Sequence, residues 1–227
     1  MENLGRPWVK GDGELPTLPL TVDDSLKGKV SVGSFLLEKA SAGNRPASLD
    51  EALRELETRY RDLWAGPPDA HEALQPARRL YHAIGIDPSK TRPSSESLLR
   101  RVLQGKELYR VNAIVDAANL ASLTMLLPVG LYDAAKIEPP VSLRLGREGE
   151  EYEGIRKDKI HLTGRPALID QIGPFGNPTS DSLRTCVTEN TERVWFVLFA
   201  PADYPPATLK DDLLRAREIL GRHASTP

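Results

Sequence analysis

The chain has 227 residues, of which 40% are hydrophobic and 27% charged, as expected for a globular protein with one large domain or two small ones. Its formal net charge of −2 is not the bulk signature of a nucleic-acid-binding protein, so any RNA contact must use a local patch, and we expect no DNA partner. The single cysteine, Cys186, excludes an internal disulfide and fits a reducing compartment. No run of about 18 apolar residues predicts a membrane span, and the polar N-terminus does not resemble a signal peptide. We therefore expect a cytoplasmic protein with no membrane partner.

The first half of the chain predicts mainly helices. Apolar residues recur there at helical spacing, and Gly or Pro residues separate the periodic segments. The predicted elements are, in chain order, an extended lead-in over 1–28, a strand over 29–38, a helix over 49–63 with a capping box at Ser48 and Glu51, a break over 65–71, a helix from Pro76 to Gly85 and a helix over 94–105.

The second half predicts mainly strands. Residues 139–146 alternate apolar and polar side chains, whereas 193–200 are apolar without alternation, which indicates a strand buried on both faces. A further strand is predicted over 165–172, and an amphipathic helix over 207–222 ends the chain. Helices that precede strands favour one α+β domain, over 29–222, with a short tail over 223–227.

An unusual polar stripe marks the segment 111–133, which is predicted to be a helix followed by a turn at LPVGLYD. Asn112, Asp116 and Asn119 are spaced i, i+4 and i+7, so they share one face of an otherwise apolar helix. Two interpretations remain open. The three side chains satisfy neighbouring backbone groups, or at least one of them contacts a ligand.

A second candidate is the segment GPFGNPTSDSLRT, residues 173–185, predicted to be a loop between two strands. Glycine lets the backbone approach a ligand closely, and the hydroxyl and amide groups offer neutral donors and acceptors. Such a loop suits a pocket that positions a polar substrate or a water molecule. The alternative is a structural loop packed by its own side chains.

Other features give weaker signals. The basic residues beside the stripe could contact phosphate, or could simply form a solvated helix end; they are Arg100, Arg101, Lys106 and Arg110. The four histidines show no metal-ligand spacing, and no P-loop or dinucleotide fingerprint occurs. We therefore expect neither a metal nor a cofactor.

Five blocks together resemble one family, the B3/B4 domain of the bacterial phenylalanyl-tRNA synthetase beta subunit, in a stand-alone form. The blocks are SSESLLRRVLQGK, VNAIVDAANLASL, LPVGLYDAAKI, VSLRLGREGE and ALIDQIGPFGNPTSDSLRTCVTENT. The resemblance covers roughly residues 75–200. It implies a layered α+β fold around a β-sandwich of unusual topology, with flanking helices. It also implies an editing function, the hydrolysis of tRNA esterified with the wrong amino acid.

This chain departs from the family in both segments of the editing pocket. Gly130 stands where synthetases commonly carry a histidine, and GPFGNPTSDSLRT replaces a glycine-rich stretch with a glutamate. No aminoacylation or ATP-binding motif is visible, so the chain is not a complete synthetase.

The resemblance gives the polar residues expected roles in an ester hydrolase that uses a positioned water and no strong nucleophile. Asp116 or Asp181 would bind the α-amino group, and the neutral polar side chains would orient the water or the carbonyl. We expect catalytic roles for Asn119, Ser180 and Asp181, and substrate contacts from Asn112, Asp116, Asn177, Thr179 and Arg184. The expected partner is tRNA or aminoacyl-tRNA, held weakly. The alternative is a non-catalytic module that binds RNA or an amino-acid-like ligand.

Overall fold

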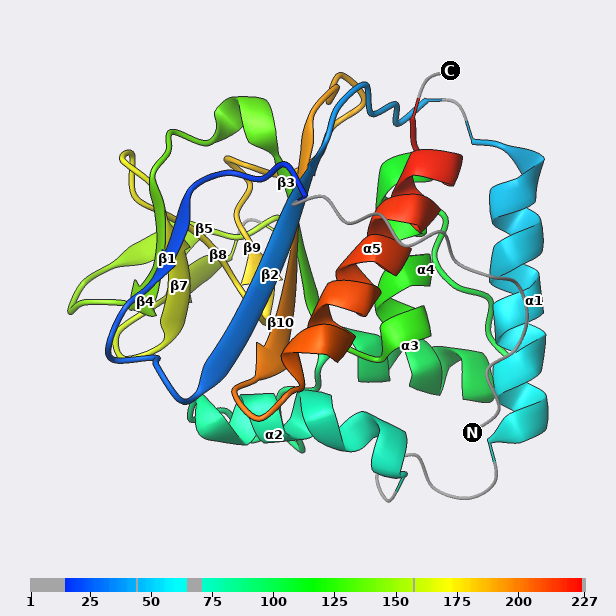
Figure 1. Ribbon diagram of the computed structural model, residues 1–227, viewed down its shortest axis with the longest axis horizontal. Helices are drawn as coiled ribbons and strands as arrows, with labels where there is room; N and C mark the ends of the chain where they lie inside the picture. The colour runs from blue at the N-terminus through cyan, green and yellow to red at the C-terminus, as the bar shows by residue number, and fades with distance from the viewer. Residues whose placement is uncertain (1–14, 44, 65–70, 157, 226–227) are drawn as a thin grey trace.

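The chain folds into three layers, which are a five-stranded sheet, a three-stranded sheet and a group of helices (Figure 1). The computed structural model describes residues 15–43, 45–64, 71–156 and 158–225. The three-stranded sheet lies in the middle, because its two faces belong to two different hydrophobic clusters. One cluster includes the helices and the other includes the five-stranded sheet.

The α-helices of the described residues lie mostly on one side of the middle sheet. They are α1 (Ala47–Leu63), α2 (Gln75–Ala83), α3 (Ser94–Leu103), α4 (Ala113–Met125) and α5 (Pro206–His223). Helix α4 is central to this layer and contacts α1, α3 and α5, whereas α2 crosses below the sheets and contacts β10 (Figure 1). Within the described ranges, no helix is both long and apolar enough to cross a membrane.

The strands form two main sheets and a separate pair. The large sheet has the order β1 (Leu20–Val22), β4 (Val141–Leu145), β7 (Pro166–Ile169), β8 (Pro174–Asn177) and β9 (Ser180–Asp181). The middle sheet has the order β2 (Val30–Leu37), β10 (Val194–Pro201) and β3 (Val129–Asp133), and it is antiparallel throughout. The pair consists of β5 (Glu151–Glu153) and β6 (Lys159–His161).

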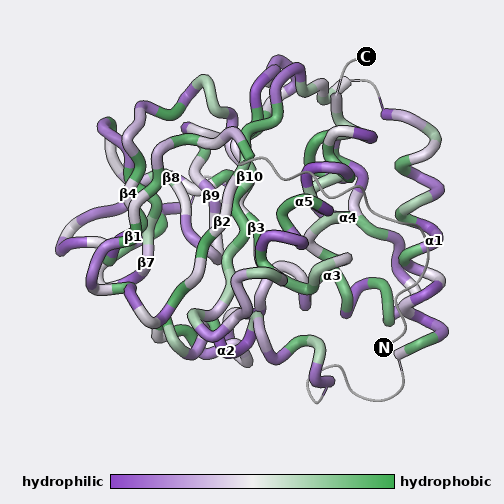
Figure 2. The backbone as a smooth tube through the Cα atoms, in the orientation of Figure 1, coloured by the Kyte–Doolittle hydropathy of each residue, from purple (hydrophilic) through white to green (hydrophobic). Residues whose placement is uncertain are grey.

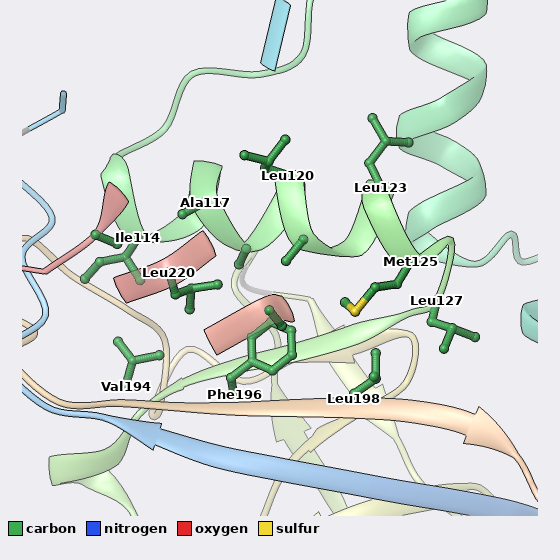
Figure 3. Close-up of a cluster of buried hydrophobic side chains, with 14 of the residues drawn as sticks. Ile114, Ala117, Leu120, Leu123, Met125, Leu127, Val194, Phe196, Leu198 and Leu220 are labelled. Atoms are coloured by element: carbon green, nitrogen blue, oxygen red, sulfur yellow. The ribbon is translucent and has the colours of Figure 1, made fainter. Parts of the chain in front are cut away.

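Strand β10 forms the centre of the protein, and its burial on both faces confirms the prediction from its continuous apolar sequence. Phe196 points toward α4 and α5, where it packs near Ile114 and Leu220 (Figure 3). On the opposite face, Trp195 and Val197 enter the cluster between the two sheets. The middle sheet appears hydrophobic along much of its length, whereas α1 alternates between hydrophobic and hydrophilic residues (Figure 2). Burial therefore follows the periodicity of each element.

This arrangement confirms the predicted α+β class, with a β-sandwich core and a C-terminal amphipathic helix. The sandwich consists of the two main sheets, whose facing side chains form one continuous cluster. Helix α5 turns Leu213, Ala216 and Leu220 toward the core. The predicted lead-in contributes an edge strand, because β1 pairs in parallel with β4. Residues 1–14 of the lead-in and 65–70 of the predicted break lie outside the described residues.

The predicted capping box of the first helix is wrong. Helix α1 begins at Ala47, and its N-cap residue is Pro46, which makes no side-chain capping hydrogen bond. The Ser48 hydroxyl instead lies 3.2 Å from Nδ1 of His223, at the end of α5. The Ser48 hydroxyl thus contacts a residue near the C-terminal end of the chain and does not cap the helix.

Two segments predicted as irregular form strands. The LPVGLYD turn contains β3, which pairs with β10 from Val129 to Asp133. The predicted loop over 173–185 begins with the β8–β9 hairpin. Strand β8 contains Pro174 and Gly176, which local propensity disfavours in strands, and it forms by pairing with its chain neighbours β7 and β9. Strand β3 instead pairs with β10, which lies much later in the chain.

Candidate functional site

The polar stripe on α4 begins with contacts that hold the N-terminus of the helix. Asn112 is the N-cap residue, and its Oδ1 accepts a hydrogen bond from the Val115 N–H at 2.9 Å. The fully buried Asp116 carboxylate accepts a hydrogen bond from the Val111 N–H at 3.1 Å and forms an ion pair with Arg45. The structural interpretation therefore accounts for two of the three stripe residues.

Asn119 differs from the other two stripe residues. It is half-buried in the middle of α4, one turn after Val115. Within the described ranges, no hydrogen bond reaches its side-chain amide. Of the stripe, Asn119 is therefore the residue whose whole side-chain amide has no hydrogen-bond partner among the described residues.

The segment from Pro174 to Asp181 is a tight hairpin organised by Asn177. The buried Oδ1 of Asn177 accepts hydrogen bonds from the N–H and the hydroxyl of Thr179, both at 2.7 Å, and from the Ser180 N–H at 2.9 Å. Three donors on one side-chain oxygen define an Asx turn, which reverses the chain at Pro178 and Thr179. The Tyr81 hydroxyl fixes this turn to α2 by donating to the Pro178 carbonyl at 2.8 Å. Asn177 and Thr179 thus shape the hairpin that presents Ser180 and Asp181.

Asp181 is a half-buried carboxyl with unusual titration. Burial raises its pKa to about 7, although the Tyr132 hydroxyl and the Leu131 N–H act in the opposite direction by favouring the charged form. The Tyr132 hydroxyl is close enough for each group to affect the pKa of the other, but their alignment is not that of a regular hydrogen bond. Carboxyl groups that titrate near neutral pH are concentrated at functional sites.

Ser180 connects the hairpin to the β5–β6 pair. Its carbonyl oxygen accepts a hydrogen bond from the Tyr152 hydroxyl at 2.6 Å. Its own side chain makes no hydrogen bond with another described residue and is half-buried. Ser180 and Asp181 are therefore adjacent polar side chains at one end of the hairpin.

Arg184 is engaged in a structural clamp. Its two terminal nitrogens donate to the two oxygens of Asp170, each at 3.0 Å, and Nη1 also donates to the Lys136 carbonyl at 3.0 Å. Burial alone would raise the pKa of Asp170, but hydrogen bonds from Arg184 and from the Glu138 and Gly173 N–H groups together lower it. The guanidinium predicted to bind substrate thus holds three chain segments together.

One of the predicted basic residues stacks on an exposed aromatic ring, and two more lie in the same segment of the chain. The Arg101 guanidinium stacks 4.0 Å above the centre of the Tyr109 ring, and that side chain is 60% exposed. Lys106 is exposed in the same loop, and Arg110 lies 3.5 Å from Asp50. We call Arg101, Lys106, Tyr109 and Arg110 the Tyr109 patch.

Arg100 faces a different environment. Its Nε donates to the fully buried carboxylate of Glu96 at 2.9 Å, and Arg78 donates to the same carboxylate with two nitrogens at 2.8 Å. This contact assigns Arg100 a role in neutralising a buried charge.

The predicted site residues thus form two groups. Asn112 and Asp116 lie at the start of α4, where Asp116 pairs with Arg45, whereas Asn177 to Asp181 gather in the β8–β9 hairpin. Strand β3 lies between them, because it follows α4 and contacts both α4 and β9. No hydrogen bond or ion pair of the described residues joins the two groups.

Sequence analysis missed Tyr132 and Arg45. Tyr132 is fully buried in β3, with its ring edge-on to Phe175 at a centroid distance of 5.1 Å. A glycine two residues before it, Gly130, was a signal, because residues i and i+2 of a strand share a face. No comparable local signal marks Arg45, which lies 71 positions from Asp116.

The fold and site define a layered α+β sandwich domain. Its edge strand β9 carries Asp181, a carboxyl whose pKa burial raises to about 7. The model of the B3/4 domain family matches residues 76–203, and the chain belongs to this family.

Relatives of the chain include phenylalanine–tRNA ligase beta subunits. The protein from Parasynechococcus marenigrum (strain WH8102) is 27% identical over 225 residues, covering 83% of this chain and 26% of the relative. The protein from Synechococcus sp. (strain CC9605) is 32% identical over 132 residues, covering 52% of this chain and 16% of the relative. The chain thus spans about a quarter or less of the length of these relatives.

A solved structure also aligns with the chain. It is the crystal structure of an N-terminal fragment of the phenylalanyl-tRNA synthetase beta subunit from Pyrococcus horikoshii, with a TM-score of 0.48 and 13% identity. The alignment covers 95% of this chain and 52% of that fragment.

Proposed function

We propose that the protein hydrolyses the ester bond of misacylated tRNA, or of a related aminoacyl ester, and that Asp181 acts as the general base. The curated relatives are beta subunits of a tRNA ligase, which makes an aminoacyl ester of tRNA the natural substrate class. The single observation that carries the proposal is the half-buried Asp181 carboxyl, whose pKa burial raises to about 7.

A base with this pKa suits the proposed chemistry. A general base works best when its pKa lies near the working pH, because it is then partly deprotonated yet basic enough to accept a proton. Asp181 would take a proton from water as the water oxygen bonds to the ester carbonyl. The bond from that carbonyl carbon to the ribose oxygen then breaks, and the ribose oxygen takes the proton.

Two neutral side chains support the same site. Ser180 is adjacent to the proposed base, and the Asn119 amide makes no hydrogen bond with the rest of the described chain. Either group can orient the water or donate to the developing oxyanion, which is an effective contribution when the ester is already activated. The Tyr109 patch provides cations and an exposed ring for the nucleic acid.

The test is a deacylation assay with a panel of mischarged tRNAs and the purified protein in excess. The wild-type rate should rise with pH and level off above about 7, as the Asp181 carboxyl ionises. Asp181→Asn should reduce the rate by about 100-fold, within the range for removal of a general base. Asn119→Ala and Ser180→Ala should give smaller losses, and Asp211→Asn, at an exposed position of α5, serves as a control carboxylate away from the hairpin. Wild-type protein that hydrolyses no member of the panel above the uncatalysed rate would refute the proposal.

A non-catalytic binding module is the second candidate. It is favoured by one observation: each of Asn112, Asp116, Asn177 and Arg184 uses at least one polar side-chain atom for a hydrogen bond within the protein. This candidate predicts that aminoacyl-tRNA binds without turnover. Retention of the radiolabelled ester on the protein, with no release of the amino acid, would support it.

A further inference from the structure

Tyr132 carries a buried hydroxyl without a regular hydrogen bond. The side chain is fully buried, and no described residue satisfies its oxygen with acceptable geometry. A buried hydroxyl left unpaired is unfavourable, and such groups in proteins are usually there for a reason. A phenylalanine would fill the same apolar space between the sheets without that cost.

Two glycines make room for this hydroxyl. A Cβ atom at Gly130 or at Gly176 would overlap the hydroxyl end of the Tyr132 ring. Gly130 lies on β3 and Gly176 on β8, so the ring end is enclosed by glycine backbone from two strands. Neither glycine has a positive φ angle, so space for the ring accounts for both of them.

The strand register brings the Asp181 carboxyl to the same place. Gly176 pairs directly with Asp181 across the β8–β9 hairpin. Directly opposed residues of an antiparallel pair project their side chains to the same face. Because the Tyr132 hydroxyl occupies the side-chain position of Gly176, it lies beside the Asp181 carboxyl.

We propose that Tyr132 is a positioning residue, whose hydroxyl holds the Asp181 carboxyl in the orientation and charge state that the site uses. The effect of Tyr132 on hydrolysis rests on the proposed function. The contact itself is independent of any activity. A tyrosine hydroxyl can donate to an ionised carboxylate and accept from a protonated acid, so in this role Tyr132 would serve both charge states of Asp181.

The other groups that face Asp181 do not take over this role. From β3 the Leu131 N–H approaches the carboxylate, but it can only donate. On β5, burial and then the charge of Asp181 raise the pKa of Tyr152, so its hydroxyl stays protonated, but that hydroxyl already donates to the Ser180 carbonyl at 2.6 Å. Tyr132 is therefore the hydroxyl that can follow the protonation of Asp181.

The test compares Tyr132→Phe with Tyr81→Phe. Tyr81 is a matched control, because its buried hydroxyl also supports the hairpin, through the Pro178 carbonyl, but is not among the groups that act on Asp181. NMR of carbon-13-labelled aspartate should give a midpoint for Asp181 about one pH unit higher in Tyr132→Phe than in wild type, because a donor to the charged form is lost. Tyr81→Phe should leave the midpoint unchanged. An unchanged midpoint in Tyr132→Phe, or equal shifts in both variants, would overturn the proposal.

A second measurement needs no change at Tyr132. The Tyr132 ring signal in carbon-13-labelled wild-type protein should move with the Asp181 titration, and this movement should be absent from Asp181→Asn. A Tyr132 ring signal that does not shift as Asp181 titrates would contradict the proposal. Both NMR readouts apply to inactive protein, so failure of the proposed hydrolysis is distinguishable from failure of the positioning role. If deacylation occurs, its pH midpoint should move with that of Asp181.

Discussion

Arg45 forms an ion pair with the buried carboxylate of Asp116 and donates to Asp50 at 2.7 Å, so one guanidinium connects two helices. The Asp116 side chain is fully buried, whereas 24% of the Arg45 side chain is exposed. Removing Arg45 leaves a buried negative charge without its partner. We expect Arg45→Ala to lower the free energy of unfolding by about 2–3 kcal/mol, less than for a fully buried pair.

Chemical denaturation measures this change, with Arg59→Ala as the control. Arg59 is an exposed arginine of α1, the helix that carries Asp50, so its removal should change stability by less than about 0.5 kcal/mol. Equal, small effects of both substitutions would show that the pair with Asp116 contributes little.

Asp181 should make stability fall as the pH rises. Its pKa in the folded protein is raised from 3.8 to about 7 by burial, so the folded state binds a proton more tightly than the unfolded state. The stabilising contribution is complete below the unfolded pKa of 3.8 and is lost as the pH rises through 7. We expect Asp181→Asn, which cannot ionise, to exceed the wild type in stability at pH 8 by about 2 kcal/mol.

The measurement is a series of denaturant titrations from pH 4 to pH 8 on both proteins. The two curves should coincide below about pH 4, diverge as the pH rises from about 4 to about 7, and keep a constant separation above that. Parallel curves would indicate that Asp181 keeps an ordinary pKa, and Asp181 would then be unsuited to act as the general base. A gain in stability with a loss of activity would be the usual sign of a functional residue.

The elements with strong periodicity were predictable from the sequence. Strand β10 is apolar at every position because each of its faces contacts a different cluster, and helix α5 has one apolar stripe because it contacts the sheet on one side. In both elements, the order of apolar and polar residues matches the faces that are buried. The helical spacing of the stripe did not show that Asn112 lies outside the helix, as its N-cap residue in extended conformation.

The site was only partly predictable, because its contacts join segments far apart in the chain. Asp181 was recognised as a candidate, yet its raised pKa depends on burial against β3, some 50 residues earlier. The relation of Tyr132 to Gly176 depends on the packing of one sheet on another. Whether a polar residue contacts a ligand or another residue is decided by such packing, as Arg184 shows.

Arg184 gives a test that separates binding from structure. Its bidentate contact with the buried side chain of Asp170 predicts that Arg184→Ala lowers the free energy of unfolding by about 2–3 kcal/mol, since a buried carboxylate loses its partner. Arg184→Lys keeps the charge but loses the fork geometry, so it should lie between alanine and wild type. Per folded molecule, KM for an aminoacyl ester should stay unchanged in both variants. If KM rises in the lysine variant while its stability is unchanged, Arg184 contacts the substrate as the sequence predicted.

The Tyr109 patch predicts how RNA affinity responds to substitution. The Tyr109 ring is 60% exposed while Arg101 stacks on it, so it offers a platform for an unpaired base beside the exposed Lys106. Because stacking contributes about 1–3 kcal/mol per base, Tyr109→Ala should weaken tRNA binding about tenfold, whereas Tyr109→Phe should keep most of it. Lys106→Ala should weaken binding and reduce its salt dependence, and Lys210→Ala, an exposed cation of α5, should do neither. Fluorescence anisotropy with labelled tRNA at several salt concentrations measures all four variants. Equal losses for Lys106→Ala and Lys210→Ala would mean that the attraction is diffuse and that this patch is no specific contact.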